Sequence, residues 1–136
     1  MKLKAQTGGV AMFDIRIKHV LDEIEPLDGY RIMVDKKVPS GYDEHKLHID
    51  MWARDALPSE RALEILQSTE NWSLFEKVYF KELEKEKDLP IQAVVEKAKL
   101  GTVTLLYDSG NREQNNAVAM RDYLIINEKV LLKEAA

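Results

Sequence analysis

An apolar run, a tight polar turn and a helical pattern follow one another from residue 102 onwards, and this order constrains the fold more than any other feature. The run "TVTLLY" (102–107) has the composition of a buried strand. "DSGN" (108–111) supplies turn residues, and Asn111 with Gln114 resembles a capping box that starts a helix. A strand, a turn and a capped helix in this order predict a βα unit of a mostly parallel sheet.

Two earlier segments also have strand patterns. Residues 13–21 alternate apolar and polar side chains, which is typical of a strand at or near the edge of a sheet. Residues 30–34, "YRIMV", are mostly apolar and fit a more central strand, with Asp35 at its carboxyl end. Residues 130–132 are compatible with either a short final strand or the end of a helix.

Three further helices are predicted between residues 59 and 101. Ser59 is a typical N-cap, so we expect a helix from there to about Gln67. Asp88 is expected to cap another helix, which Gly101 ends. The helix between these two has apolar side chains at steps of three and four, which predicts a face that packs against the sheet: Trp72, Phe75, Tyr79 and Leu83.

Residues 36–58 form the longest stretch without a regular pattern, and we expect a short helical turn near 47–53. Strands and helices that alternate in this way predict a small three-layer α/β sandwich. It has a mostly parallel sheet of three to five strands and helices on both faces. Ligands of such sheets bind outside the carboxyl ends of the strands. Largely buried positions should include Tyr30, Ile32, Val34, Leu105 and Trp72.

The 136 residues predict a single α/β domain, with residues 1–12 as a loose leader before it. The chain has no cysteine, no secretory signal and no apolar stretch of about 18 residues, so we expect a cytoplasmic protein that does not enter membranes. A net charge of -4 argues against a general nucleic-acid binder, although a local basic patch stays open. The oligomeric state is not indicated.

Four groups of residues, in order along the chain, match the motifs of a known family. The first group is Ile15, Lys18, Asp28, Gly29, Tyr30, Arg31, Val34, Asp35, Pro39 and Gly41. The second is Trp52, Arg54, Asp55, Pro58 and Ser59. The third is Trp72, Phe75, Tyr79, Glu82 and Leu83, and the fourth is Val103 to Tyr107 with Asn115 to Val118. In this order and spacing, residues 15–124 resemble the domain of unknown function 488 (DUF488) family, in its short YeaO-like branch.

The chain departs from the family pattern in one loop. Where the family has two arginines and a tryptophan, this sequence has Lys36, Ser40 and Val38. An arginine offers a planar fork to a carboxylate or phosphate, and a lysine does not. An anion site implied by the resemblance is therefore altered here. The family's name implies no activity.

The candidate site combines strand ends with polar loops. Asp35, Asp55 and Asp108 are candidate acids, bases or metal ligands, and the alternative is that they cap loops or pair with Lys36, Arg31 or Arg54. Asn115 and Asn116 either brace a neighbouring loop or contact a ligand. The candidate ligand-binding residues are Lys36, Lys37, Ser40, Arg54, Tyr107, Asn115 and Asn116.

His45 and His48 have the spacing of metal ligands, but the sequence specifies no third ligand, so we predict neither a metal site nor a cofactor. Two functions follow. The first is a protein that binds a small anionic ligand at the strand ends, with or without hydrolase-like chemistry. The second is a non-catalytic adaptor that meets a protein partner through its acidic helices and residues 36–58.

Overall fold

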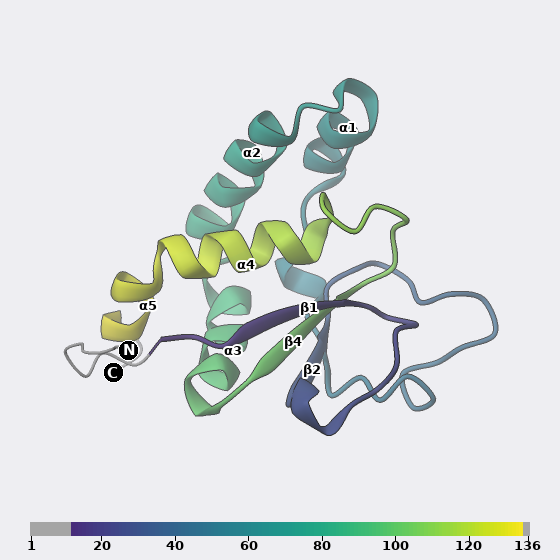
Figure 1. Ribbon diagram of the computed structural model, residues 1–136. Helices are drawn as coiled ribbons and strands as arrows, with labels where there is room; N and C mark the ends of the chain where they lie inside the picture. Colours follow the sequence, from purple (N-terminus) through teal and green to yellow (C-terminus); the bar gives the residue numbers. More distant parts are fainter. Residues whose placement is uncertain (1–11, 135–136) are drawn as a thin grey trace.

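The computed structural model describes residues 12–134 and contains an all-parallel four-stranded sheet with five α-helices (Figure 1). The strands are β1 (Ile15–His19), β2 (Tyr30–Met33), β3 (Met51–Trp52) and β4 (Val103–Tyr107), in the order β1-β4-β2-β3. The α-helices are α1 (Glu60–Thr69), α2 (Trp72–Lys85), α3 (Asp88–Leu100), α4 (Asn116–Ile126) and α5 (Glu128–Glu134). Two 3₁₀ turns are η1 (Pro26–Asp28) and η2 (Arg54–Ala56).

The last strand in the sequence lies inside the sheet. β4 pairs with β1 on one side, where His19 is opposite Tyr107, and with β2 on the other, where Met33 is opposite Leu106. Because all three strands are parallel, their carboxyl ends meet at one edge. The predicted α/β sandwich and its mostly parallel sheet are confirmed, and β1 is the expected edge strand.

The two faces of the sheet are covered differently. Alternate residues of the strands, such as Ile32 and Leu105, join the larger apolar cluster, which contains buried side chains from all five α-helices. Met33 and Leu106 point to the other face, where Val20 and Leu47 complete a smaller cluster. The second face is therefore covered mainly by segment 34–50, and the helices expected on both faces of the sheet pack on one face in the described part of the chain.

The buried side chain of Arg31 ties segment 34–50 to the sheet. The Arg31 guanidinium donates to Asp28 Oδ2 at 2.6 Å and to the carbonyl oxygens of Leu47 and His48 at 3.0 and 3.1 Å. Lys18 adds a second cation 3.0 Å from Asp28 Oδ1. Burial opposes the charge of Asp28, but hydrogen bonds from the Glu25 amide, Lys18 and Arg31 hold its pKa below the usual range. The family motif around Asp28 and Arg31 therefore has a structural role here.

Three local predictions were wrong. Residues 47–53 contain β3, which pairs with β2, rather than a helical turn. The helix expected from Asn111 begins at Asn116, and Asp88 is the first helical residue rather than the cap. Residues 130–132 are helical, which confirms the second of the two predicted alternatives.

The remaining predictions for single elements fare better. Ser59 is the N-cap of α1, because its hydroxyl oxygen accepts a hydrogen bond from the Ala62 amide at 3.1 Å. Ile32, Val34 and Leu105 are fully buried as expected, whereas Tyr30 and Trp72 are only half-buried.

The predicted leader at 1–12 lies outside the described residues except for Met12. Over residues 12–134, no helix has the length and apolar character that a membrane crossing requires.

Candidate functional site

Asp35 and Asp108 lie side by side at the carboxyl ends of the two central strands. The Asp108 amide donates to Asp35 Oδ2 at 2.9 Å, and the Val34 amide donates to the Leu106 carbonyl just before it. One step beyond the β2–β4 pairing, a backbone amide of one segment is therefore bonded to a side-chain carboxylate of the other. Two polar segments about 70 residues apart in sequence share this edge because parallel strands end together.

The first turn of α4 closes the other side of Asp35. Asn116 Nδ2 donates to the Val34 carbonyl at 3.2 Å and to Asp35 Oδ1 at 3.3 Å. Asn115 is the N-cap, since its Oδ1 accepts from the Val118 amide at 3.0 Å. Asn116 thus braces the end of β2, and Asn115 sets where α4 begins.

The carboxylate of Asp35 is half-buried, and each of its oxygens accepts a hydrogen bond from the protein. Burial raises the pKa of Asp35, and the charge of Asp108 acts in the same direction. Hydrogen bonds from the amides of Asp108 and Lys36 oppose that rise. The backbone is held as well, because Trp52 Nε1 donates to the Asp35 carbonyl at 2.6 Å. These contacts hold both the side chain and the backbone of Asp35 in place.

His19 belongs to this edge, although the sequence analysis did not single it out. Its Nδ1 accepts from the Leu21 amide at 3.0 Å, so Nε2 carries the proton and donates to the Asp108 carbonyl at 3.3 Å. Nε2 is also 3.9 Å from Asp108 Oδ1. The signal in the sequence was its place at the end of β1, opposite Tyr107.

An ion pair connects the loop after β1 to the loop before α4. Arg112 donates to both carboxylate oxygens of Asp22, at 2.9 and 3.0 Å. The hydrogen bonds from Arg112 hold the pKa of Asp22 at about 2. Tyr107 lies beneath this pair, and burial raises the pKa of its hydroxyl. Tyr107 is fully buried, so the structure gives it a supporting position rather than an open one.

A cleft of about 540 Å³, the strand-end pocket, opens beside Asp35. Its walls come from the end of β2, from α1 and from the loop that enters α4. Leu63 and Leu66 give it an apolar side, and amide side chains dominate the rest. The polar lining consists of Asp35, Lys36, Gln67, Glu70, Ser109, Asn111, Gln114, Asn115 and Asn116.

A smaller hollow of about 330 Å³, the outer hollow, adjoins this pocket. Asp35, Lys36, Lys37, Asp108 and Ser109 line it. Both lysines are exposed, so they offer mobile cations next to two carboxylates. Asp35, Lys36 and Ser109 line both cavities and therefore connect the two.

The other predicted site residues lie elsewhere. Asp55 is exposed in η2, after the edge strand β3, and lines neither cavity. Ser40 is also exposed and lines neither of them. The Arg54 guanidinium lies 3.9 Å from the centre of the Trp52 ring and 3.4 Å from Glu44. The three aspartates therefore do not converge, and only Asp35 and Asp108 meet.

The departure from the family loop has a visible structural result. Val38, where the family has tryptophan, is half-buried against the smaller apolar cluster of Met33, Leu47 and Leu106. The loop therefore still covers the sheet.

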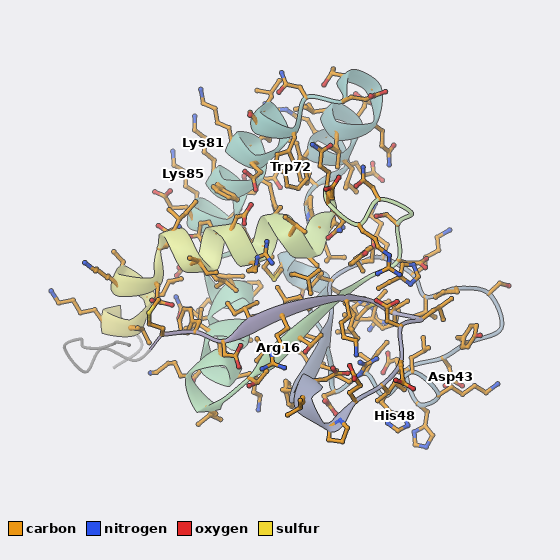
Figure 2. The ribbon with its side chains drawn as sticks, viewed as in Figure 1. Arg16, Asp43, His48, Trp72, Lys81 and Lys85 are labelled. Atoms are coloured by element: carbon orange, nitrogen blue, oxygen red, sulfur yellow. The ribbon has the colours of Figure 1, made fainter. Side chains whose placement is uncertain are left out.

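The two histidines of interest lie on the outer part of segment 34–50. His45 and His48 are exposed, and Figure 2 shows His48 and Asp43 projecting from the side of the molecule away from the helices. Over residues 12–134, no three histidine, aspartate or glutamate side chains are arranged to hold a metal ion.

What this edge can do chemically follows from how its groups are paired. Asp35 already accepts two hydrogen bonds, and His19 Nδ1 accepts from a backbone amide. Each carboxylate oxygen can accept two hydrogen bonds, so these contacts position Asp35 without using all of its lone pairs. The exposed lysines and exposed amide side chains beside it line open space, so the edge offers both donors and acceptors to a bound molecule.

Comparison with known proteins agrees with the fold and the motifs. Residues 14–134 match a family described as the inactive DUF488-N3 subclade. The uncharacterized protein YeaO of Escherichia coli (strain K12) is 31% identical over 112 residues, which cover 82% of this chain and 96% of that protein. An uncharacterized protein of Mycobacterium tuberculosis (strain H37Rv) is 32% identical over 50 residues, 37% of this chain and 42% of that protein. No significant match exists among solved structures.

The matched region runs from just before β1 to the end of α5 and so includes the whole strand-end edge. The family motif residues Asp28, Arg31, Asp35, Asn115 and Asn116 make the contacts described above. The chain belongs to the DUF488 family, in its inactive DUF488-N3 subclade.

Proposed function

We propose that this protein is a non-catalytic binding protein that holds a small anionic molecule in the strand-end pocket. The observation that carries the proposal is a cleft of about 540 Å³ whose wall combines Lys36 with several amide side chains. Asp35 is held beside this cleft by hydrogen bonds from Asp108 and Asn116, which give the carboxylate a positioning role. The description of the subclade as inactive supports a function without catalysis.

The anionic character of the ligand rests on Lys36 and on α4. Lys36 lines both cavities, and its ammonium is 4.0 Å from the exposed Glu60 carboxylate, a distance that leaves it available to a bound anion. The amino end of α4 meets the same pocket, and helix amino ends favour negative charge. Gln67 and Gln114 offer both donors and acceptors to the uncharged part of such a molecule.

A thermal-shift screen tests this proposal. Phosphates, nucleotides, carboxylates and divalent metals are added singly at constant ionic strength. An anion present at about 100 times its dissociation constant stabilises the folded state by about 2.7 kcal/mol, which raises the melting temperature by roughly 10 °C.

Variants then locate the binding. Lys36→Ala and Gln114→Ala should each abolish the rise, whereas Lys133→Ala, a change of an exposed lysine on α5, should leave it intact. A rise that survives both pocket variants places the ligand elsewhere and contradicts the proposal. Hydrolysis of any stabilising compound would contradict its non-catalytic part.

The alternative function is an adaptor that meets a protein partner. The observation in its favour is a set of exposed apolar side chains on the helices, including Leu89 and Leu100 of α3 at 82% exposure each. A screen without any stabilising compound would favour this alternative. In either case we expect the protein to act in the cytoplasm, as the absence of cysteine suggests, and without nucleic acid, since its net charge is -4.

A further inference from the structure

A third cavity, the basic pocket, shares Lys36 with the other two and is not used by the proposed function. It has a volume of about 340 Å³ and is formed where segment 34–50, η2, the start of α1 and the start of α3 come together. Leu57 and Pro58 form an apolar wall. The charged residues that line it are Lys36, Arg54, Glu60 and Lys87.

The charge of this pocket is opposite to that of the chain. Three cations and the carboxylate of Glu60 line it, and Glu44 lies next to Arg54, so cations still outnumber carboxylates here in a protein whose net charge is -4. The cations come from three separate parts of the sequence, at residues 36, 54 and 87. The fold, rather than a local charge run, therefore assembles them around one space.

Arg54 is held in place at this pocket. Its guanidinium lies 3.9 Å from the centre of the Trp52 ring, and the Glu44 carboxylate is 3.4 Å away. Both contacts restrict a long side chain that would otherwise be mobile, so less entropy is lost when an anion binds. Trp52 itself is fixed by its hydrogen bond to the Asp35 carbonyl.

Lys87 is the cation without a described counter-charge. It is partly buried, and within residues 12–134 no carboxylate lies within ion-pair distance of its ammonium. Among the described residues, Lys36 has the Glu60 carboxylate 4.0 Å away. A lysine commonly buries its aliphatic stem and leaves its charged head accessible, so the ammonium of Lys87 is open to a bound anion.

We infer that the basic pocket binds a doubly charged oxyanion, namely the phosphate group of a small phosphorylated molecule, between Lys36, Arg54 and Lys87. A phosphate group matches both the charge of the pocket and its donors. Its oxygens accept several charge-assisted hydrogen bonds at once, and the guanidinium offers two parallel donors to it. The volume is large enough for a phosphate group but leaves most of a larger molecule outside.

Inorganic phosphate is the probe for the test. Its binding to the whole protein is measured by calorimetric titration and by melting temperature, with sodium chloride used to keep the ionic strength constant. Lys87→Ala and Lys87→Gln should each weaken binding about tenfold, since one charge-assisted contact is lost. Lys87→Gln retains most of the side-chain length and guards against a loss of packing.

Lys85→Ala is the matched control. Lys85 is exposed near the end of α2, and Figure 2 shows it projecting away from the body of the protein, next to Lys81. This variant should bind phosphate as the natural protein does. Equal weakening by Lys85→Ala would mean that only the overall charge matters, and unchanged binding in both Lys87 variants would mean that the pocket is not the site. Either result overturns the inference.

A further variant separates this inference from the proposed function. Gln114→Ala alters the strand-end pocket but not the basic pocket. It should therefore leave phosphate binding unchanged while it abolishes binding of any ligand of the strand-end pocket. If no phosphate binding is found with the natural protein, the inference is wrong and the proposed function is unaffected.

Discussion

At Gly29 the surrounding backbone leaves no room for a side chain. Its φ is +65°, and a Cβ atom built there would lie 2.2 Å from the carbonyl oxygen of Thr102. That carbonyl also accepts the Tyr30 amide at 3.0 Å, which aligns β2 with β4. The glycine of the family motif is therefore needed because the backbones of two strands meet there.

Gly29→Ala should consequently destabilise the protein by about 2 to 4 kcal/mol, because it combines backbone strain with a backbone clash. Gly110→Ala is the control, since a Cβ atom there meets nothing within 4 Å. We expect that change to stay within about 0.5 kcal/mol. Urea unfolding followed by circular dichroism measures both, and similar values for the two variants would contradict this account.

Asp35 allows a second prediction at the scale of one residue. An asparagine has one acceptor oxygen where the carboxylate has two, so Asp35→Asn leaves either the Asp108 amide or the Asn116 side chain without an acceptor. The expected loss of stability is about 1 to 2 kcal/mol. Asp55→Asn, at an exposed position in η2, should change stability by less than about 0.5 kcal/mol. Equal effects in urea unfolding would show that Asp35 has no special structural role.

Helices α2 and α4 are joined by a contact between two acids. Glu76 of α2 has a buried Oε2 with no hydrogen-bond partner among the described residues. Burial, followed by a hydrogen bond and repulsion from Asp122 of α4, raises the pKa of Glu76 to about 8. Arg121 lies 3.8 Å from Asp122 and partly offsets its charge. The pair of carboxyl groups formed by Glu76 and Asp122 therefore keeps a proton at neutral pH.

The pH dependence follows from the direction of that shift. A carboxyl whose pKa is higher in the folded state than in the unfolded chain stabilises the fold fully below the unfolded pKa, near 4.5, and loses this contribution as the pH rises through about 8. Stability should thus fall between pH 5 and 8 by about 1 to 2 kcal/mol, allowing for solvent screening of a partly exposed pair. Glu76→Gln should remove this slope and be the more stable protein at pH 8. Parallel slopes for both proteins in urea unfolding would refute this assignment.

Elements with a clear period were predictable, and short or competing signals were not. The apolar run of β4 predicted a buried strand, and the stripe of Phe75 and Tyr79 predicted a buried helix face, as found. The stripe was expected to pack against the sheet, whereas α2 makes its main contacts with α1, α3 and α4. β3 has only two residues, so it carries no alternation to detect. Asn111 and Asn115 both accept amide hydrogen bonds through Oδ1, and the sequence does not tell which of them starts α4.

At the scale of the whole molecule, the strand-end edge was predictable in outline because parallel strands end together. The meeting of Asp35 and Asp108 follows from that rule once β2 and β4 are neighbours. The position of Asp55 depends on β3, and the nearness of Lys87 to Lys36 depends on how α3 is placed. Both are consequences of packing between distant segments, for which a single sequence has no periodic signal.

The unequal covering of the two sheet faces has a consequence for where the protein opens locally. Segment 34–50 lacks regular helix or strand, and the side chain of Arg31 anchors it with two hydrogen bonds, to the carbonyl oxygens of Leu47 and His48. We expect it to detach locally at a lower free energy than the helical layer, as a separate cooperative unit. In hydrogen exchange, the amides of Leu47 and Ile49 should lose protection well before those of β4, and Arg31→Leu should accelerate them selectively. Uniform exchange across both layers would mean that the molecule opens only as a whole.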